Sequence, residues 1–370
     1  MKPLFQIAFA FALILCVQSV VASELVFIGR GDKNIHVGRL DPTTGALTDV
    51  RQVAELLAPS FLCIAPSHHF LYAVSEGQTP EKSAISAFAI GADGALTFLN
   101  RQPSGGSGPC HVSVDPQGKC VMTANYGSGS MAVFPIQPDG SLGARSAFFQ
   151  DQGSSVNQER QQGPHAHCVL TDPADRYAFD CDLGLDQVLI YKIDPATGTL
   201  TPNDPPFFAG KPGSGPRHLT FHPNGRFAYL INELDSTIVT LAYDASAGSF
   251  SALQSSPLLP NDYNGKSTAA EVVVHPSGKF VYGSNRGHDS ITVFSCDPDT
   301  GHLTFVERHS SGGKTPRNFE IDPSGAFLLA ANQSGVVVIF RIDPATGKLT
   351  ETGNAVHIPI PMCIKCLPEN

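Results

Sequence analysis

The 370-residue chain contains no tryptophan, few charged residues and, beyond its N-terminus, no long apolar run. Its 24 lysines and arginines are outnumbered by 33 aspartates and glutamates, which gives a net charge of −9. Nucleic acid is not an expected partner, because binding to phosphates needs a basic surface that displaces their counterions. Without a later apolar run long enough to cross a bilayer, the sequence also predicts no membrane partner.

The N-terminus has the features of an export signal. Lys2 supplies a positive charge, residues 4–17 form a continuous apolar stretch, and small residues follow in "SVVAS". The stretch is short for a membrane span, and cleavage near Ala22 or Ser23 fits the small-residue rule for signal peptides. We therefore predict a signal peptide over residues 1–23 and a soluble protein that is exported, either periplasmic or secreted.

The nine cysteines do not by themselves indicate a redox or metal site. Cys16 would leave with the signal peptide, and the remaining eight permit disulfides in an oxidising compartment without requiring them. A lipoprotein anchor at Cys16 is disfavoured, because Leu15 stands where a small residue is expected. The "CIKC" at 363–366 has no matching second pair and lies in a strand-like segment, which favours a packing role.

Glycine and proline are abundant, with 35 and 29 residues, and they recur in a fixed phrase. "DPATGTL" at 194–200 and "DPATGKL" at 343–349 are two of seven related turns. Asp, Pro and Gly suit a tight turn through a capping side chain, a fixed φ and a positive φ. The glycines of the seven turns are Gly45, Gly94, Gly140, Gly198, Gly248, Gly301 and Gly347. This spacing predicts a seven-fold repeat with a period near fifty residues.

A second turn phrase alternates with the first, as in "HPNGR" at 222–226 and "HPSGK" at 275–279. Short β-rich runs such as "FAYLIN" and "ITVFSC" lie between the turns, so each repeat contains four strands, here called a to d. Four antiparallel strands at this period predict an all-β, seven-bladed β-propeller. A WD40 propeller is disfavoured because its tryptophan-containing signature is absent, and no kelch-type double glycine recurs.

The two ends of the mature chain complement each other. "IPMCIKCLP" near the C-terminus has the pattern of a strand a, and no strand b follows it. The segment "LVFIGRGDKNIHVGRL" near the N-terminus resembles strands b and c without a strand a. We therefore predict that one blade is completed by both chain ends, which removes an open sheet edge. Residues 24–370 are expected to form a single propeller domain.

Charged and imidazole side chains gather on one predicted face of the disc. The a–b and c–d turns form the other face and are alike in every repeat, whereas the d–a and b–c connections vary and are the expected place for function. The b–c connections supply Glu233 and Arg286, and the longest d–a connection, 150–167, is expected over the same channel mouth. The starts of the strands a supply His111, His165, His167, Arg217, His218, Glu271, Arg317 and Asn318. This set suits a small anionic ligand.

Several long phrases resemble the 6-phosphogluconolactonase-type propeller lactonases, a family that also includes carboxymuconate cyclases. They are "GSSVNQERQQGPHAHCVLTDP", "DLGLDQVLIY", "GPRHLTFHPNGRFAYLINELDSTI" and "HPSGKFVYGSNRGHDSITVF". The resemblance covers almost the whole mature chain and implies lactonase activity. By motif it implies a catalytic set of His167 or His165, Arg217, Glu233 and Arg286. Substrate binding is expected from Arg317, Asn318, Glu271, His111 and His218.

Lactone hydrolysis would assign roles to these residues. Glu233 or a histidine could accept the proton of the attacking water. Arg217 and Arg286 could stabilise the oxyanion or hold a carboxylate or phosphate. No metal site and no cofactor are expected, because "HAH" alone lacks the spacing of a ligand set. The substrate is expected to be a small anionic lactone, and the protein a monomer.

Three functions remain open from the sequence. The first is hydrolysis of a sugar-acid lactone, whether phosphorylated or, given the predicted export, unphosphorylated. The second is a carboxymuconate-type cyclase or lactone isomerase, which would act on dicarboxylates. The third is an exported propeller that binds a ligand without catalysis. A purely structural role also competes, because Glu233 and Arg217 could pair simply to join neighbouring blades.

Overall fold

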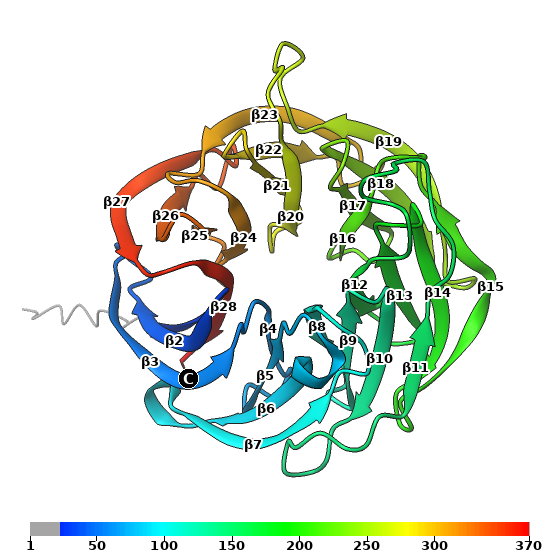
Figure 1. The fold of residues 1–370 in the computed structure, drawn as a ribbon. Coiled ribbons are helices and arrows are strands. Elements are labelled where there is room, and N and C mark those ends of the chain that lie inside the picture. Colours follow the sequence, from blue (N-terminus) through cyan, green and yellow to red (C-terminus); the bar gives the residue numbers. More distant parts are fainter. Residues whose placement is uncertain (1–22, 370) are drawn as a thin grey trace, which may run out of the picture.

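Seven four-stranded antiparallel sheets surround a central channel, as Figure 1 shows for the computed structural model. The structure describes residues 23–369, so the predicted signal peptide, 1–23, lies almost entirely outside the described residues. Within the described part, no helix is long and apolar enough to span a membrane. The only helical segments of residues 23–369 are the short 3-10 turns η1 (Pro80–Lys82) and η2 (Ala92–Gly94). The predicted seven-bladed propeller is confirmed.

Each sheet presents one strand to the channel and one to the rim. The innermost strands, a, are β4 (Leu62–Ile64), β8 (Pro109–Val114), β12 (Ala166–Thr171), β16 (Pro216–Phe221), β20 (Thr268–Val274), β24 (Pro316–Ile321) and β28 (Pro361–Pro368). The second strands, b, are β1 (Glu24–Arg30), β5 (Phe70–Ser75), β9 (Cys120–Asn125), β13 (Tyr177–Asp182), β17 (Phe227–Asn232), β21 (Phe280–Arg286) and β25 (Phe327–Asn332).

The outer half of each sheet is formed by strands c and d. Strands c are β2 (Lys33–Leu40), β6 (Ala84–Ile90), β10 (Ser130–Pro135), β14 (Gln187–Asp194), β18 (Thr237–Asp244), β22 (Ser290–Cys296) and β26 (Val336–Ile342). Strands d are β3 (Leu47–Leu57), β7 (Leu96–Pro103), β11 (Ala147–Gln150), β15 (Thr199–Ala209), β19 (Ser249–Pro257), β23 (Leu303–Ser310) and β27 (Leu349–His357).

The ring is closed by the two ends of the described chain. One sheet has the order β28-β1-β2-β3, and its last strand in the chain pairs antiparallel with its first. Phe27 of β1 lies opposite Lys365 of β28, and in Figure 1 the red strand joins the blue sheet. The predicted closure is therefore confirmed.

The two turn phrases adopt the backbone that their residues favour. Gly140 has φ of 84°, and a Cβ added there would lie 2.1 Å from the ring of Phe70 in the preceding sheet. In the a–b turns, Asp175 and His68 take the same left-handed conformation where the phrase departs from glycine. The repeat therefore fixes the turn geometry even where the residue changes.

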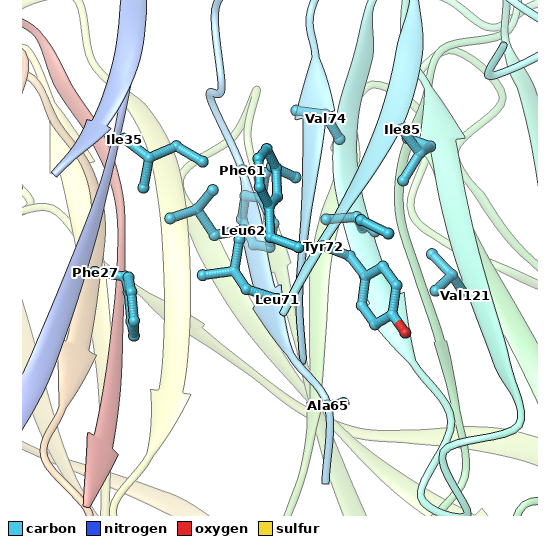
Figure 2. Close-up of a cluster of buried hydrophobic side chains, with 14 of the residues drawn as sticks. Phe27, Ile35, Phe61, Leu62, Ala65, Leu71, Tyr72, Val74, Ile85 and Val121 are labelled. Carbon is cyan, nitrogen blue, oxygen red and sulfur yellow. The ribbon is translucent and has the colours of Figure 1, made fainter. Parts of the chain in front are cut away.

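The core lies between neighbouring sheets rather than inside each one. Figure 2 shows one such cluster, in which Phe27, Leu71 and Val121 come from three successive sheets. The hydroxyl of Tyr72 donates to the backbone oxygen of Gly140 at 2.9 Å, which ties a strand b to the c–d turn of the next sheet. Tyr229 and Tyr282 make the equivalent bonds to the backbone oxygens of Gly301 and Gly347, each in the c–d turn of the following sheet. These buried hydroxyls are thereby satisfied while their rings fill the inter-blade core.

Three buried carboxylates lie together near the end of β13. Asp180 and Asp182 belong to this strand, and Asp151 follows β11. Neither carboxylate oxygen of Asp180 receives a hydrogen bond from a donor among the described residues. Burial, and then the charges of Asp151 and Asp182, raise the pKa of Asp180 well above its usual range. The pKa of Asp151 is likewise raised, by burial first, to about 8. Protons are therefore retained here at neutral pH.

Asp180→Asn is expected to raise the free energy of unfolding by about 1–3 kcal/mol at pH 7.5, because it removes a buried carboxyl without a donor. Because the pKa of Asp180 is raised in the folded state, the carboxyl lowers the stability of that state increasingly as the pH rises above the unfolded pKa, near 3.8. The gain should therefore be smaller at pH 5 than at pH 7.5 when urea unfolding is measured at both. Asp299→Asn, on a side chain that is 93% exposed, is the control. A variant less stable than wild type at both pH values would contradict this account.

Candidate active site

Six of the seven innermost strands, all except β4, share a local irregularity in their pairing with the second strand. In β12 the pairing with β13 passes from Ala166 directly to Cys168, and in β16 it passes from Pro216 to His218. A β-bulge of this kind lets consecutive side chains reach the same space instead of alternating between faces. The residues left out of the pairing are Cys110 in β8, His167 in β12, Arg217 in β16, Ala270 and Glu271 in β20, Arg317 in β24 and Met362 in β28.

Glu233 is the centre of a charged cluster at this mouth. It follows β17, is buried, and its backbone N–H donates to the oxygen of Gly215 at 2.7 Å. Its Oε2 accepts hydrogen bonds from Arg217 at 3.0 Å and lies 2.8 Å from the guanidinium of Arg286. Its Oε1 accepts from Arg160 at 2.7 Å. Three guanidinium groups, from the connection 150–167, from β16 and from the end of β21, therefore converge on one carboxylate.

These contacts decide the protonation state of the cluster. Burial raises the pKa of Glu233, but the charges of Arg286, Arg217 and Arg160 outweigh it and lower the pKa to about 2. Burial, together with Arg286 and Arg317, lowers the pKa of Arg217 to about 9. Both groups are therefore ionised at neutral pH, and a carboxylate held this firmly is a weak proton acceptor.

A cavity of about 200 Å³ opens beside Glu233. It is lined by Glu76, Cys110, Tyr126, Arg160, His167, Glu233, Arg286 and Arg317. With Arg217, which contacts Glu233 from within the protein, four guanidinium groups face two carboxylates. The cavity thus has an excess of positive charge although the whole chain is acidic. A small anion is the ligand that this balance favours.

His167 and His165 occupy different positions in the site. His167 is buried and lines the cavity, with its Nδ1 3.7 Å from the sulfur of Cys110. Burial, and then the charge of Arg217, lower its pKa well below 6.5, so the imidazole is neutral at pH 7. His165 stacks on Tyr126 with ring centroids 4.5 Å apart, and its Nδ1 contacts the backbone oxygen of Tyr126. It is not among the residues that line the cavity.

The predicted substrate-binding residues are divided between two cavities. Arg317 lines the cavity of Glu233, whereas His111, His218 and Glu271 line a second cavity of about 440 Å³ along the channel. There the Nδ1 of His218 lies 2.8 Å from Oε1 of Glu271. Asn318 donates to Oε2 of Glu271 at 2.6 Å and accepts from the N–H of Ile364. Three of the five, His218, Glu271 and Asn318, therefore form a separate hydrogen-bonded group. His111 packs beside this group, with its ring centroid 5.3 Å from that of His218.

Sequence reasoning had not singled out Arg160, Tyr126, Glu76 or Cys110. Arg160 lies in the long connection 150–167, where it is the only arginine or lysine, and its guanidinium also contacts the hydroxyl of Tyr126 at 3.0 Å. The connection is held in place through Ser155, whose hydroxyl donates to Asp186 at 2.5 Å. Arg160 could have been identified from the sequence as the single basic residue in a long connection expected over the channel mouth.

No group of three or more histidine, cysteine, aspartate or glutamate side chains within residues 23–369 is arranged to hold a metal ion. The eight described cysteines are free thiols. Cys363, from the "CIKC" segment, is buried in an inter-blade core cluster. The residues that line the cavity beside Glu233 supply guanidinium, carboxylate, imidazole, thiol and phenol groups.

The ring of seven four-stranded sheets and the positively charged cavity at its mouth define a seven-bladed β-propeller with a candidate site for a small ligand. Residues 24–366 match the family described as "Lactonase, 7-bladed beta-propeller", and the chain belongs to this family.

Relatives over nearly the full length carry consistent names. A 6-phosphogluconolactonase of Bacillus subtilis is 39% identical over 341 residues, which cover 92% of this chain and 96% of the relative. One of Formosa agariphila is 36% identical and covers 85% and 90% of the two chains. The solved structure of a periplasmic gluconolactonase from Pseudomonas aeruginosa is 32% identical, with a TM-score of 0.89 and coverage of 94% and 99%.

Proposed function

We propose that this protein hydrolyses a sugar-acid lactone in the cavity beside Glu233. The observation that carries the proposal is the carboxylate of Glu233 shared by Arg160, Arg217 and Arg286 next to a neutral imidazole. The names of the relatives, 6-phosphogluconolactonase and periplasmic gluconolactonase, support the same class of carboxylic-ester hydrolase.

The proposed mechanism uses His167 as the proton acceptor. Water attacks the acyl carbon of the lactone while His167 takes its proton, and Arg286 and Arg317 stabilise the negative charge on the carbonyl oxygen. The acyl–oxygen bond then breaks, and the ring oxygen takes the proton from His167 to give the open hydroxy acid. This acid ionises and releases one proton per turnover. Glu233 acts by fixing the guanidinium groups, and Arg217 supports it from within the protein.

The charge of the cavity supports an anionic lactone. An excess of about two positive charges matches a phosphate monoester, which carries about −1.5 to −2 at pH 7. We therefore rank 6-phosphogluconolactone ahead of unphosphorylated gluconolactone. The same excess suits a dicarboxylate, and this observation keeps a carboxymuconate-type cyclase as the second candidate.

Proton release from 6-phosphogluconolactone, gluconolactone and a muconolactone tests the proposal, with the spontaneous rate subtracted. The expected result is turnover of the phosphorylated lactone with the highest kcat/KM. Faster turnover of gluconolactone would contradict the preference for a phosphorylated substrate but would still support lactonase activity. Activity on the dicarboxylate alone would favour the cyclase. Ligand-induced thermal stabilisation without any turnover would favour a binding propeller.

We also propose that residues 1–23 are an export signal and that 24–370 form the mature, monomeric propeller. The composition of the N-terminus and the periplasmic relative support export. N-terminal sequencing of the protein from the extracytoplasmic fraction should begin near Ser23 or Glu24. Recovery of the uncleaved chain from the cytoplasm would contradict this.

Arg160→Met is expected to raise KM about tenfold, or about 1.4 kcal/mol of binding energy, with little change in kcat. Arg160 is partly exposed and reaches the cavity from a loop, so it is expected to hold the anionic group of the substrate rather than the reacting carbonyl. Steady-state kinetics would measure the effect, with Arg176→Met, half exposed in an a–b turn, as the control. A loss confined to kcat would contradict a binding role.

A further inference from the structure

Two neighbouring innermost strands carry cysteine and histidine in opposite order, and the side chains pair across them. Cys110 of β8 lies 3.7 Å from Nδ1 of His167, and Cys168 of β12 lies 3.6 Å from Nε2 of His111. The first pair lines the cavity of Glu233, and the second lines the larger cavity of about 440 Å³. The proposed lactonase mechanism does not use the second pair.

The two thiols differ in their protonation. Burial raises the pKa of Cys168, but the thiol of Cys181 and the imidazoles of His111 and His218 outweigh this, so that the pKa lies well below 9. Burial raises the pKa of Cys110 far above 9. Cys168 is the one cysteine in residues 23–369 whose pKa is lowered. A thiolate beside an imidazole is the nucleophilic form of cysteine.

A second thiol lies beside Cys168. Cys181 of β13 is directly opposite it in the antiparallel register, and both belong to the same buried cluster. Residues directly opposite in such a pair have Cα atoms roughly 4.5–5.5 Å apart, and disulfides join Cα atoms about 4.4–6.8 Å apart. Burial raises the pKa of Cys181 well above 9, so it remains a thiol at neutral pH.

We propose that Cys168 is a site of oxidation by hydroperoxides and that Cys181 resolves the product as a cross-strand disulfide. Cys168 lines the larger cavity, whose volume of about 440 Å³ is large enough for a molecule of the size of hydrogen peroxide. The thiolate attacks one peroxide oxygen, the O–O bond breaks, and the leaving hydroxide takes a proton to become water. Cys181, on losing its proton, then attacks the sulfenic sulfur of Cys168, and the S–O bond breaks with release of a second water. The two thiols lose two electrons, which the peroxide gains.

This reaction would place an oxidant-sensitive bond one residue from His167. Its test does not depend on lactonase activity. Purified protein is treated with hydrogen peroxide at pH 7 and analysed by mass spectrometry of the intact chain and of its peptides. The expected product has lost two hydrogen atoms and contains Cys168 linked to Cys181. Oxidation at Cys168 should be at least about tenfold faster than at Cys110, because the pKa of Cys168 is lowered and that of Cys110 is raised.

Variants locate each step. Cys181→Ser should stop the reaction at a sulfenic acid on Cys168 that dimedone captures, whereas Cys110→Ser should leave the oxidation of Cys168 unchanged. Peptide mapping of the wild type decides the proposal even if a variant fails to fold. Oxidation of Cys110 before Cys168, or a reduced Cys168 after the other thiols have reacted, would overturn it.

Discussion

His167→Gln is expected to lower kcat/KM for the lactone by about 10²–10⁴, the usual contribution of a positioned general base. Glutamine fills a similar space and retains a hydrogen-bonding group, but it cannot accept the proton of the attacking water. Since burial and Arg217 lower the pKa of His167 well below 6.5, the wild-type kcat/KM should stay level through pH 6.5 and fall only at lower pH. Steady-state rates across pH, for wild type and variant, measure both effects.

His165→Gln is the matched control for this experiment. His165 stacks on Tyr126 beside the cavity without lining it, so its replacement should cost much less than that of His167. Equal losses in the two variants would contradict the assignment of the base. If His167→Gln hydrolysed the lactone as fast as the wild type, another group would have to accept the proton of the attacking water.

Glu233→Gln is expected to lower the free energy of unfolding by about 3–5 kcal/mol at pH 7, as when one partner of a buried ion pair is removed. The substitution leaves Arg217, whose side chain is 1% exposed, and Arg286 without their carboxylate. A lowered pKa means that Glu233 stabilises the folded state above its unfolded pKa, near 4.5. This contribution is lost as the pH falls from 4.5 toward 2.

Urea unfolding at pH 7 and pH 3 measures this contribution. The difference between wild type and Glu233→Gln should be smaller at pH 3. Glu351→Gln, at an exposed position on β27, should change stability by no more than about 0.5 kcal/mol at either pH. A loss below about 1 kcal/mol for Glu233→Gln at pH 7 would show that the cluster is not held as the contacts indicate.

The architecture could be predicted from the sequence because each blade repeats the same local signals. Turn phrases such as the one that contains Gly347 require a positive φ, and they recur seven times with a period near fifty residues, as in a ring of similar sheets. The complementary ends of the chain likewise predicted the pairing of β28 with β1. The sequence placed Glu233, Arg217 and Arg286 on one face of the disc, and in the structure these side chains are in contact.

The division of the site into two cavities could not be predicted. His111 and His167 occupy similar positions at the starts of their strands, yet only His167 lines the cavity of Glu233. Both strands bulge at their second residue, which is Cys110 in β8 and His167 in β12. His111 therefore stands one position further along its strand than His167 and lines the larger cavity. Arg160 was missed for another reason: it lies in an extension with no counterpart in the other repeats.

The most direct test of the proposed active site is the rate of lactone hydrolysis by wild type and Arg217→Met on 6-phosphogluconolactone, after subtraction of the spontaneous rate. Arg217 has no access to bulk solvent and acts through Glu233 and the cavity beside it. The account predicts turnover by the wild type and a loss of about 10²–10³ in the variant, the usual cost of removing one oxyanion-stabilising group or its support. A folded Arg217→Met variant as active as the wild type would contradict the placement of the active site.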